Sequence, residues 1–467
     1  MIEFPFSGGT VGDDIFLSPQ RTVNLYPEVG QYKTGAALIG WPGDTKYASL
    51  GTGPMRGSKI FKDHSVHVSG SGVYKVDKGG IVSTIGSLTT VSGFVGMAES
   101  GLELMIVDGV NGFIWNGDTF TQILDAEFIQ LNSDSVAYLD NAFWVNRPGT
   151  GQFYGSNVLD ASTWTATKLA SAEYKSDNIT KIWTDRELMI GGDTTVQVYY
   201  NSGASPMPME PLRQGRLIYG VASKDSIKVV DNTTHGLFVD ENGGVFAGRL
   251  NGYTIERIST RGLERYWYSI DYTDAYALAI HFGGHEFYVL TFPQADTGRG
   301  RTFAYEAESR VWFEIGNFVT GINDFEKYHA LTHFFFDGKN LIGDESGDLW
   351  ALDSDVYTFQ GANEILSVRR CPVIHDSRDR LFFDSLEFDL EVGNGLNSGQ
   401  GSDPKMTLKI SDDGGRTFNN QRETSIGAQG KYEERVKFHQ LGSSYDRVFE
   451  IMISDPVPRR IMGAYLE

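Results

Sequence analysis

The residues of this sequence best arranged for a specific local chemistry form the stretch SDDGGRTF, from Ser411 to Phe418. Its spacing resembles the Asp-box pattern S-x-D-x-G-x-x-W, with Ser411, Asp413, Gly415 and Phe418 at the four defined positions. In that pattern the Asp side chain accepts hydrogen bonds within a hairpin turn, and the aromatic ring packs inward. The box is a fold element remote from catalysis. A single copy therefore predicts a structural turn.

A second group of charged side chains, between Arg257 and Tyr266, could act on a sugar. Arg257, Arg261 and Arg265 could grip a carboxylate, and Glu264 lies beside Tyr266 as the pair that a sialidase-like site needs. The same residues equally fit a rim of solvated charges. A carbohydrate-binding or glycoside-hydrolysing, sialidase-like β-propeller is therefore the alternative function.

Standard signatures of catalytic and nucleotide-binding sites do not occur in the sequence. It contains no P-loop, no HExxH zinc motif and no GxSxG nucleophile motif. His281 and His285 are four residues apart, but AIHFGGHEF is typical of a strand and turn, which would not place them side by side. Acidic turns such as GDESGD at 343–348 lack the full calcium-loop spacing. We expect no enzyme, no catalytic residue, no metal site and no cofactor.

Composition and charge narrow the class of protein further. The 467 residues include 60 acidic and 40 basic side chains, a formal charge of −20, which argues against a nucleic-acid reader that neutralises phosphates. The start, MIEFPFSGG, lacks the regions of a secretory signal, and no apolar run is long enough to span a membrane. The single cysteine, Cys371, fits folding in a reducing compartment.

The elements that must position these residues are strands. Apolar residues alternate or form short runs bounded by Gly, Asp, Asn and Ser, and one hairpin plan recurs in seven stretches that begin near 66, 102, 136, 186, 237, 286 and 334. The spacing is that of four-stranded propeller blades, which cover each other's faces when arranged in a ring. We predict an all-β fold with a β-propeller of about seven blades; a pair of β-sandwiches is the alternative.

The two ends of the chain have a different pattern. Residues 1–48 contain prolines that interrupt regular strands, and beyond 363 the hairpin spacing gives way to a long antiparallel pattern. We expect an N-terminal arm over 1–48, a propeller over 49–362 and a β-sandwich-like domain over 363–467. The arm and the C-terminal segment together would form a platform that the propeller interrupts.

Several longer stretches resemble a known family. They are RTVNLYPE near the N-terminus, DNTTHGLFVDENGGVFAGRLNGYTIERISTRGLE in the middle, and LKISDDGGRTFNNQRE with RVFEIMISDPVPRRIMGAYLE at the end. In this order they are similar to the packaged-DNA stabilisation, or tail hub (nozzle), family of short-tailed bacteriophages. The resemblance spans roughly residues 20 to 467.

Membership would imply a structural virion protein of the phage tail, assembled in the host cytoplasm. Six copies would form a ring below the portal and adaptor, prolong the DNA channel and retain the packaged genome. Tail fibres or tailspikes would attach around the ring, a needle or plug protein could close its tip, and DNA would pass through without specific binding. The resemblance brings no catalytic residue.

Two segments are predicted to make assembly contacts. The first is the arm, through Tyr26, Pro27, Trp41 and Pro42, packed on the C-terminal domain or on a neighbouring subunit. The second is the stretch 201–216, expected between blades, where Met207 and Met209 could reach a partner or the channel. A plain blade connection is the alternative for 201–216.

Overall fold

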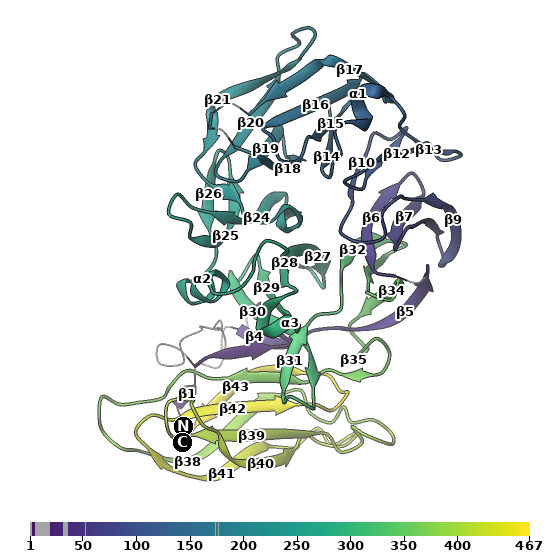
Figure 1. The fold of residues 1–467 in the computed structure, drawn as a ribbon. Helices are drawn as coiled ribbons and strands as arrows, with labels where there is room; N and C mark the ends of the chain where they lie inside the picture. Colours follow the sequence, from purple (N-terminus) through teal and green to yellow (C-terminus); the bar gives the residue numbers. More distant parts are fainter. Residues whose placement is uncertain (1, 5–18, 31–35, 52, 173, 176) are drawn as a thin grey trace.

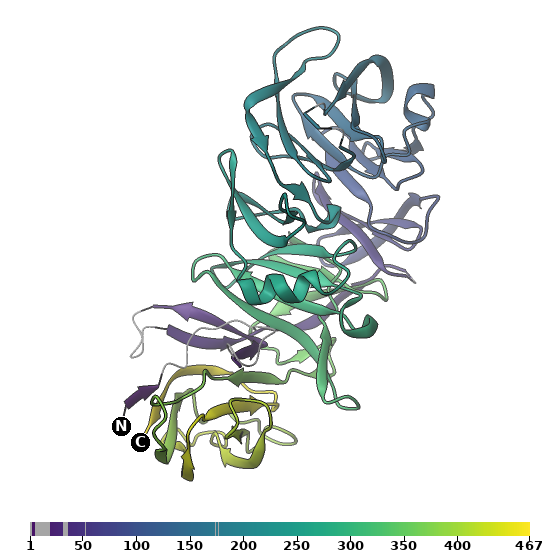
Figure 2. The same cartoon turned by 60° about the vertical axis from the view of Figure 1, so that its left-hand side comes forward.

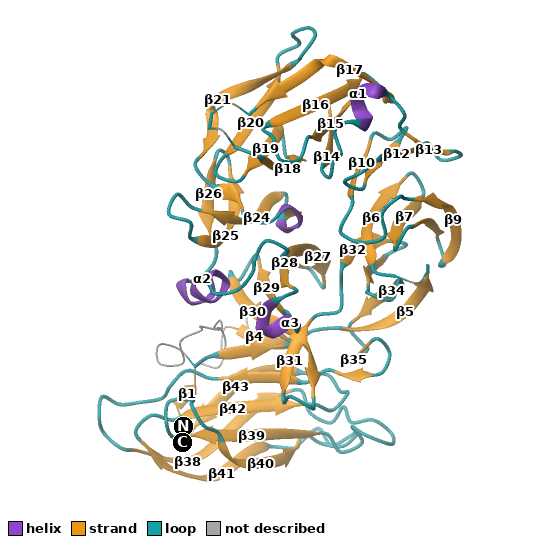
Figure 3. Ribbon diagram, in the orientation of Figure 1, coloured by secondary structure: helices purple, strands orange, loops and turns teal. Residues whose placement is uncertain are grey.

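The computed structural model describes residues 2–4, 19–30, 36–51, 53–172, 174–175 and 177–467, and these residues are almost entirely strands and turns (Figure 3). The helical pieces among them are short: α1 (Ala126–Ile129), the 3₁₀ turn η1 (Lys224–Ser226), α2 (Arg261–Tyr268) and α3 (Ala295–Gly298). The predicted all-β class is confirmed.

The first four sheets follow one another along the chain, and within each sheet every strand pairs with the next. Their strands are β6 (Met55–Phe61), β7 (His64–Ser69), β8 (Gly72–Asp77) and β9 (Ile81–Ser87) in blade 1; β10 (Gly96–Glu99), β11 (Leu104–Val107), β12 (Gly112–Trp115) and β13 (Phe120–Gln122) in blade 2; β14 (Val136–Leu139), β15 (Ala142–Asn146), β16 (Gln152–Asn157) and β17 (Asp160–Ser171) in blade 3; and β18 (Ile179–Thr184), β19 (Leu188–Gly192), β20 (Val196–Asn201) and β21 (Met209–Leu217) in blade 4.

Three further sheets complete a ring of seven within the described residues. They contain β22 (Gly220–Val221), β23 (Lys228–Val230), β24 (Thr233–Val239), β25 (Val245–Asn251) and β26 (Thr254–Arg257) in blade 5; β27 (Tyr276–Phe282), β28 (His285–Phe292), β29 (Arg301–Glu306), β30 (Val311–Val319) and β31 (Asp324–Lys327) in blade 6; and β32 (Thr332–Phe336), β33 (Lys339–Gly343) and β34 (Asp348–Asp353) with β5 (Gly43–Ser49) in blade 7. Each of the seven repeated stretches lies in a different blade.

The ring is closed by a strand from the N-terminal end of the chain. β5 pairs antiparallel with β34 and so covers the outer edge of blade 7, and β32 lies beside β6 of blade 1. Pairing this strand satisfies backbone groups that would otherwise form an open edge. The arm expected over 1–48 therefore supplies a strand to the propeller as well as to the platform.

The turns show why the sequence forms hairpins. Asp140 and Asn141 connect β14 to β15 with φ of 51° and 65°, so both occupy the left-handed region. A two-residue turn of this kind matches the twist of the strands, and Asn and Asp tolerate it better than most residues. The Asp and Asn residues between the apolar runs are thus explained by backbone geometry.

The second unit is a β-sandwich, drawn at the bottom of Figure 1. One sheet has the order β3-β4-β43-β38-β41, with β1 also on β43, and the other contains β37, β42, β39 and β40. The bounds are β1 (Ile2–Phe4), β3 (Leu25–Val29), β4 (Ala36–Gly40), β37 (Ser367–Arg370), β38 (Leu381–Leu390), β39 (Lys405–Ser411), β40 (Asn419–Ser425), β41 (Val436–Ser444), β42 (Val448–Ile453) and β43 (Arg460–Leu466). The small hairpin β35 (Thr358–Phe359) and β36 (Asn363–Glu364) precedes it.

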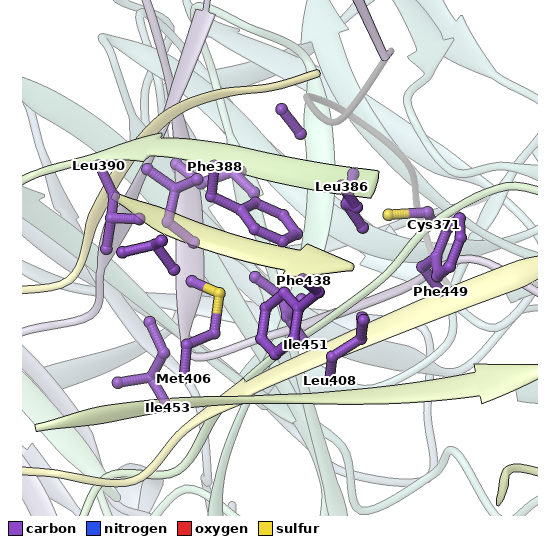
Figure 4. Packing of buried hydrophobic residues seen from close by; sticks show 14 of the residues in the cluster. Cys371, Leu386, Phe388, Leu390, Met406, Leu408, Phe438, Phe449, Ile451 and Ile453 are labelled. Carbon is purple, nitrogen blue, oxygen red and sulfur yellow. The ribbon is translucent and has the colours of Figure 1, made fainter. Parts of the chain in front are cut away.

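The sandwich core lies between its two sheets. Figure 4 shows Leu386, Phe388 and Phe438 from one sheet facing Leu408 and Ile451 from the other. Leu25 and Leu38 of the arm join the same cluster, as does the buried Cys371. The core of this domain is thus built from both ends of the chain.

A single strand of the arm, β2 (Arg21–Val23), joins the two units. It pairs antiparallel with β37 of the sandwich and meets β30 of blade 6 in parallel, so that one continuous sheet runs from the propeller into the sandwich. Figure 2 shows the resulting elongated body, with the propeller above, the sandwich below and both termini at the sandwich. The propeller is thus inserted between the two parts of the platform.

Candidate functional site: the domain junction and the assembly surfaces

The junction between propeller and sandwich is centred on Asn24, the residue after β2. Its side chain is fully buried, its Nδ2 donates to the Gly316 and Leu366 carbonyls at 2.9 Å each, and its Oδ1 accepts the Gly316 N–H at 3.0 Å. Its φ of 55° lies in the left-handed region, where Asn is enriched. One amide therefore satisfies backbone groups of blade 6 and of the segment that enters the sandwich.

An ionic cluster lies near Asn24, where Arg21 of β2 meets charged residues of blade 6. Arg21 makes a bidentate pair with Glu314 at 2.8 and 2.9 Å, and Arg301 contacts Glu314 and Asp324 at 2.9 Å each. Arg301 also pairs with Asp296. Glu314 is the buried centre, so two guanidinium groups share one carboxylate that has almost no access to water.

The charges of this cluster shift the titration of its members. Burial opposes ionisation of Asp324, but the Phe325 N–H and the charges of Arg301 and Arg21 outweigh it and hold its pKa below the ordinary value. Burial likewise lowers the pKa of Arg301, yet Glu314 and the two Asp residues raise it overall. Asp324 and Arg301 are therefore both charged near neutral pH.

The aromatic residues predicted for assembly lie inside the subunit. Tyr26 and Trp41 pack on Phe287 of blade 6 with ring centroids 5.3 and 5.1 Å away, and Pro27 and Pro42 are buried beside them. The arm does join the C-terminal domain, because β4 pairs with β43. These four side chains anchor the arm within its own chain; a contact between the arm and a neighbouring subunit stays a prediction.

The stretch 201–216 differs from the expectation. It does not lie between blades: it contains the hairpin tip between β20 and β21 within blade 4, and all of 209–216 belongs to β21. Met209 is only 3% exposed and packs in the core between blades 3 and 4, with Met207 partly buried against it. The apolar pattern around the two Met residues serves the blade core. The tip 201–206 is exposed throughout, whereas exposed and buried residues are interspersed over 209–216.

The Asp-box-like turn forms between β39 and β40. Ser411 Oγ donates to Asp413 Oδ1 at 2.7 Å, and Asp413 accepts the Arg416 and Thr417 N–H groups at 2.9 Å each. The hydrogen bonds from Ser411 and Thr417 lower the pKa of Asp413. The Gly415 N–H donates to Ser411 at 2.9 Å. Phe418 is half-buried and packs under the Arg370 guanidinium, 4.5 Å from its ring centroid, outside the sandwich core.

The residues of the sugar-site alternative do not converge. Arg257 pairs with Glu264 at 2.8 Å and Asp240 at 3.3 Å, and it lies over the Phe246 ring. Arg261 and Arg265 are exposed one turn apart on α2, and the Tyr266 hydroxyl donates to Asp296 at 3.0 Å. The carboxylate and the Tyr hydroxyl are thus engaged in contacts that fix α2 to blades 5 and 6.

A feature that the sequence pattern did not indicate is a cavity on the propeller axis. It has a volume of about 600 Å³ and is lined by the innermost strands of all seven blades. Three lysines line it: Lys59 from β6, Lys181 from β18 and Lys228 from β23. The available signal was a lysine near the start of three blades, on β6, β18 and β23, and such a lysine cannot be distinguished from an ordinary surface lysine before the ring is known.

Two further observations concern the described part of the chain only. Among its residues, no group of three or more His, Cys, Asp or Glu side chains is placed to hold a metal ion. No helix formed by these residues has both the length and the apolar composition needed to cross a membrane.

Comparison with known proteins identifies the family. A family model described as bacteriophage P22 Gp10, beta-propeller, matches residues 4–357, and one described as bacteriophage P22 Gp10, beta-sandwich, matches residues 368–467. No curated protein matches this chain.

Solved structures are similar to this chain only at low scores. The extracellular domain of a two-component system from B. thetaiotaomicron is 12% identical with a TM-score of 0.44, and the match covers 76% of this chain and 45% of that domain. The Neurospora crassa Pan2 WD40 domain is 8% identical with a TM-score of 0.41 (67% and 95% covered), and the Doa1 WD40 propeller is 10% identical with 0.39 (67% and 97% covered). At these scores the similarities say nothing further about this chain.

The two family matches cover both structural units in order, which confirms the resemblance, the propeller and the sandwich. The chain belongs to the bacteriophage P22 Gp10 family of packaged-DNA stabilisation proteins, which are structural components of the phage tail and not enzymes.

Proposed function

We propose that six copies of this chain form a ring, the nozzle of a short-tailed phage, below the portal and adaptor. The observation that carries the proposal is the match of both family models to one chain. The ring would prolong the DNA channel, retain the packaged genome and carry fibres or spikes, with a needle or plug at its tip. Assembly would take place in the host cytoplasm, before the protein becomes part of the virion tail.

The axial cavity of one propeller is too small to be the DNA channel. A sphere of about 600 Å³ is about 10 Å across, less than the ~12 Å width of the major groove of duplex DNA alone. A channel for duplex DNA would therefore lie between subunits. This geometry favours a ring of several copies over a single perforated subunit.

The charge of the chain suits such a channel. At −20, the protein repels the DNA phosphates, and duplex DNA could move along a wall of this charge without adhering. Tail function also requires a body that resists load, and the continuous sheet through β2 makes the propeller and the sandwich mechanically one piece.

In this proposal the two domains have different roles. We assign the platform, residues 1–48 and 363–467, to contacts between subunits and with the adaptor, and the propeller, 49–362, to the outer wall. Tyr26, Pro27, Trp41 and Pro42 would hold the arm in place for its neighbour. The exposed tip 201–206, which Met207 and Met209 anchor in blade 4, would contact a partner.

The test is negative-stain imaging of the purified full chain, alone and mixed with the portal–adaptor complex of the phage. Six-fold rings or tubes with an open channel in either sample are the expected result. Isolated compact particles in both samples would contradict the nozzle.

The contact at the tip needs its own variant. Ala204→Arg places a long, positively charged side chain on the exposed tip of blade 4. Asn242→Arg, on an exposed turn of blade 5, is the matched control. Ring formation should fall for the first variant only. Normal rings with both variants would remove the tip from the interface and leave the ring itself untouched.

A further inference from the structure

The axial cavity of the propeller gathers positive charge in a strongly acidic protein. Lys59, Lys181 and Lys228 come from blades 1, 4 and 5, so they approach the axis from different sides of the ring. Within the described residues, none of the three forms an ion pair or a side-chain hydrogen bond. Their neighbour Lys224, by contrast, pairs with Asp134 at 2.8 Å. Three unpaired ammonium groups thus share one cavity.

The lysines lie near enough to repel one another. The pKa of Lys228 is lowered to about 8, chiefly by burial; the charges of Lys181 and Lys59 contribute to this shift, and Asp225 partly opposes it. Burial also lowers the pKa of Lys181, with Lys224 adding to the effect and Asp225 and Asp134 opposing it. Repulsion between these ammonium groups is unfavourable, and water alone in the cavity would not offset it.

The remaining ionisable groups do not neutralise the three lysines. Asp225 and Glu99 also line the cavity, but Glu99 accepts the Gly101 N–H at 2.8 Å at the end of its strand. Burial lowers the pKa of His333 to about 4, so it is neutral near pH 7, with Asn340 3.0 Å away. The other ionisable groups that line the cavity or act on these residues are Arg56, Asp134, Tyr138, Lys224, Tyr276 and His281.

The inner edges of the blades face the cavity, because each innermost strand pairs with a partner on one side only. Some of their backbone groups are already used, since the Ile182 N–H donates to Ser135 Oγ and the Val95 N–H donates to the Arg56 carbonyl. A small oxyanion would find the ammonium groups around it, as in other phosphate-binding sites. The cavity volume of about 600 Å³ leaves room for a phosphate with a small attached group.

We propose that the axial cavity is a binding site for a phosphate-class oxyanion, held by Lys59, Lys181 and Lys228. The three lysines and Arg56, against Asp225 and Glu99, leave an excess of two positive charges among the lining residues, which a doubly charged tetrahedral anion matches. The ligand is either free phosphate or the phosphate group of a small molecule. This inference does not rest on the proposed ring.

The direct test is isothermal titration of the wild-type full chain with inorganic phosphate, with chloride used to hold the ionic strength constant. We expect saturable binding of one phosphate per chain at pH 7. Affinity at pH 9.5 should be at least about tenfold weaker, because Lys228 then loses its charge while phosphate keeps its own. No saturable binding at matched ionic strength would overturn the proposal.

Proton linkage gives an independent readout. Phosphate stabilises the charged form of Lys228, so binding at pH 8 should take up protons. The binding heat should then depend on the ionisation heat of the buffer. Equal heats in buffers of different ionisation heat would contradict the role of the lysine.

The class of ligand is tested with other anions. Glycerol phosphate in place of phosphate tests the esterified ligand. Binding of succinate as tight as that of phosphate would overturn the phosphate class.

Variants locate the site. The double variant Lys181→Met and Lys228→Met keeps the apolar stems and should lose phosphate binding by about tenfold or more. Lys78→Met, on an exposed turn of blade 1, is the matched control and should bind as the wild type does. If the double variant does not fold, Lys59→Met, the most exposed of the three, should still weaken binding several-fold. Unchanged binding in a folded cavity variant would contradict the proposed site.

Discussion

The first five blades and the domain junction are held together by different kinds of contact. In blades 1 to 4 each strand pairs with the next one along the chain, so the partners are joined by short turns, and blade 5 departs from this only slightly. At the junction, Arg21 meets Glu314 across 293 residues, and Asn24 reaches Leu366 across 342. The same chain thus uses local pairing in one region and very distant pairing in the other.

This difference has an energetic meaning. A hairpin closes a loop of a few residues, whereas the junction closes the whole propeller, and the entropy cost of closure grows slowly with loop length. Distant contacts also form late in folding, because their loops must close first. We infer that the junction depends on a small number of well-buried residues, while each blade is supported by its own hairpins.

The largest effect should come from the buried tryptophan of the arm. Trp41→Ala removes a side chain with no exposed surface that packs on Phe287 and Tyr328, and Trp144→Ala in blade 3 is the matched control, at 1% exposed. Each variant should lose about 3–5 kcal/mol of unfolding free energy. Hydrogen exchange should rise in both blade 6 and the sandwich for Trp41→Ala, but only around blades 3 and 4 for Trp144→Ala. If hydrogen exchange in Trp41→Ala rises only in the arm, the indole of Trp41 does not couple the two domains.

The same comparison explains what the sequence could predict. Blade hairpins have a local signature, such as the Asp140–Asn141 turn between apolar runs, and each of the seven repeated stretches lies in its own blade. The turn at Asp413 was visible for the same reason, because its hydrogen bonds stay within five residues. Local chemistry leaves a local pattern.

The junction and the cavity leave no such pattern. Nothing near Asn24 in the sequence indicates that its amide will meet Gly316 and Leu366, and Met209 looked like an exposed contact until its strand in blade 4 was known. Lys59, Lys181 and Lys228 become one group only when the ring brings their blades around one axis. These features depend on contacts between residues far apart in the chain.

A smaller effect, of about 2–3 kcal/mol, is expected from the buried amide of the junction. Asn24→Ala leaves the Gly316 N–H and two carbonyls without their partner, and it places alanine at a φ of 55°. The matched control is Asn146→Ala in blade 3, whose side-chain oxygen accepts the Ser133 hydroxyl and the Ser135 N–H at 3.0 Å each. Denaturant unfolding should show a similar loss of unfolding free energy for both variants. Hydrogen exchange should rise in both domains only for Asn24→Ala.

Asn24→Gly separates the two causes of this loss. Glycine tolerates the left-handed backbone but makes no side-chain hydrogen bond. A loss close to that of Asn24→Ala would assign the effect to the hydrogen bonds. Recovery of the wild-type stability would assign it to backbone strain and weaken the role of the amide in coupling the domains.

The smallest effect, and the one most sensitive to conditions, concerns the charge of Asp324. Its folded pKa lies below the ordinary 3.8, so its ionised form stabilises the protein fully above that pH, and this contribution is lost as the pH falls through the folded pKa. Asp324→Asn should therefore cost about 1 kcal/mol at pH 6, a modest value because the side chain is partly exposed, and the gap from wild type should narrow toward pH 3. Asp160→Asn, at the half-buried first residue of β17 in blade 3, where the pKa of the carboxyl is also lowered, should show the same pH dependence, with the rise in hydrogen exchange confined to its own blade. Urea unfolding at several pH values measures both. A gap for Asp324→Asn that stays constant from pH 6 to pH 3 would mean that hydrogen bonding or packing, and not charge, accounts for this part of the junction.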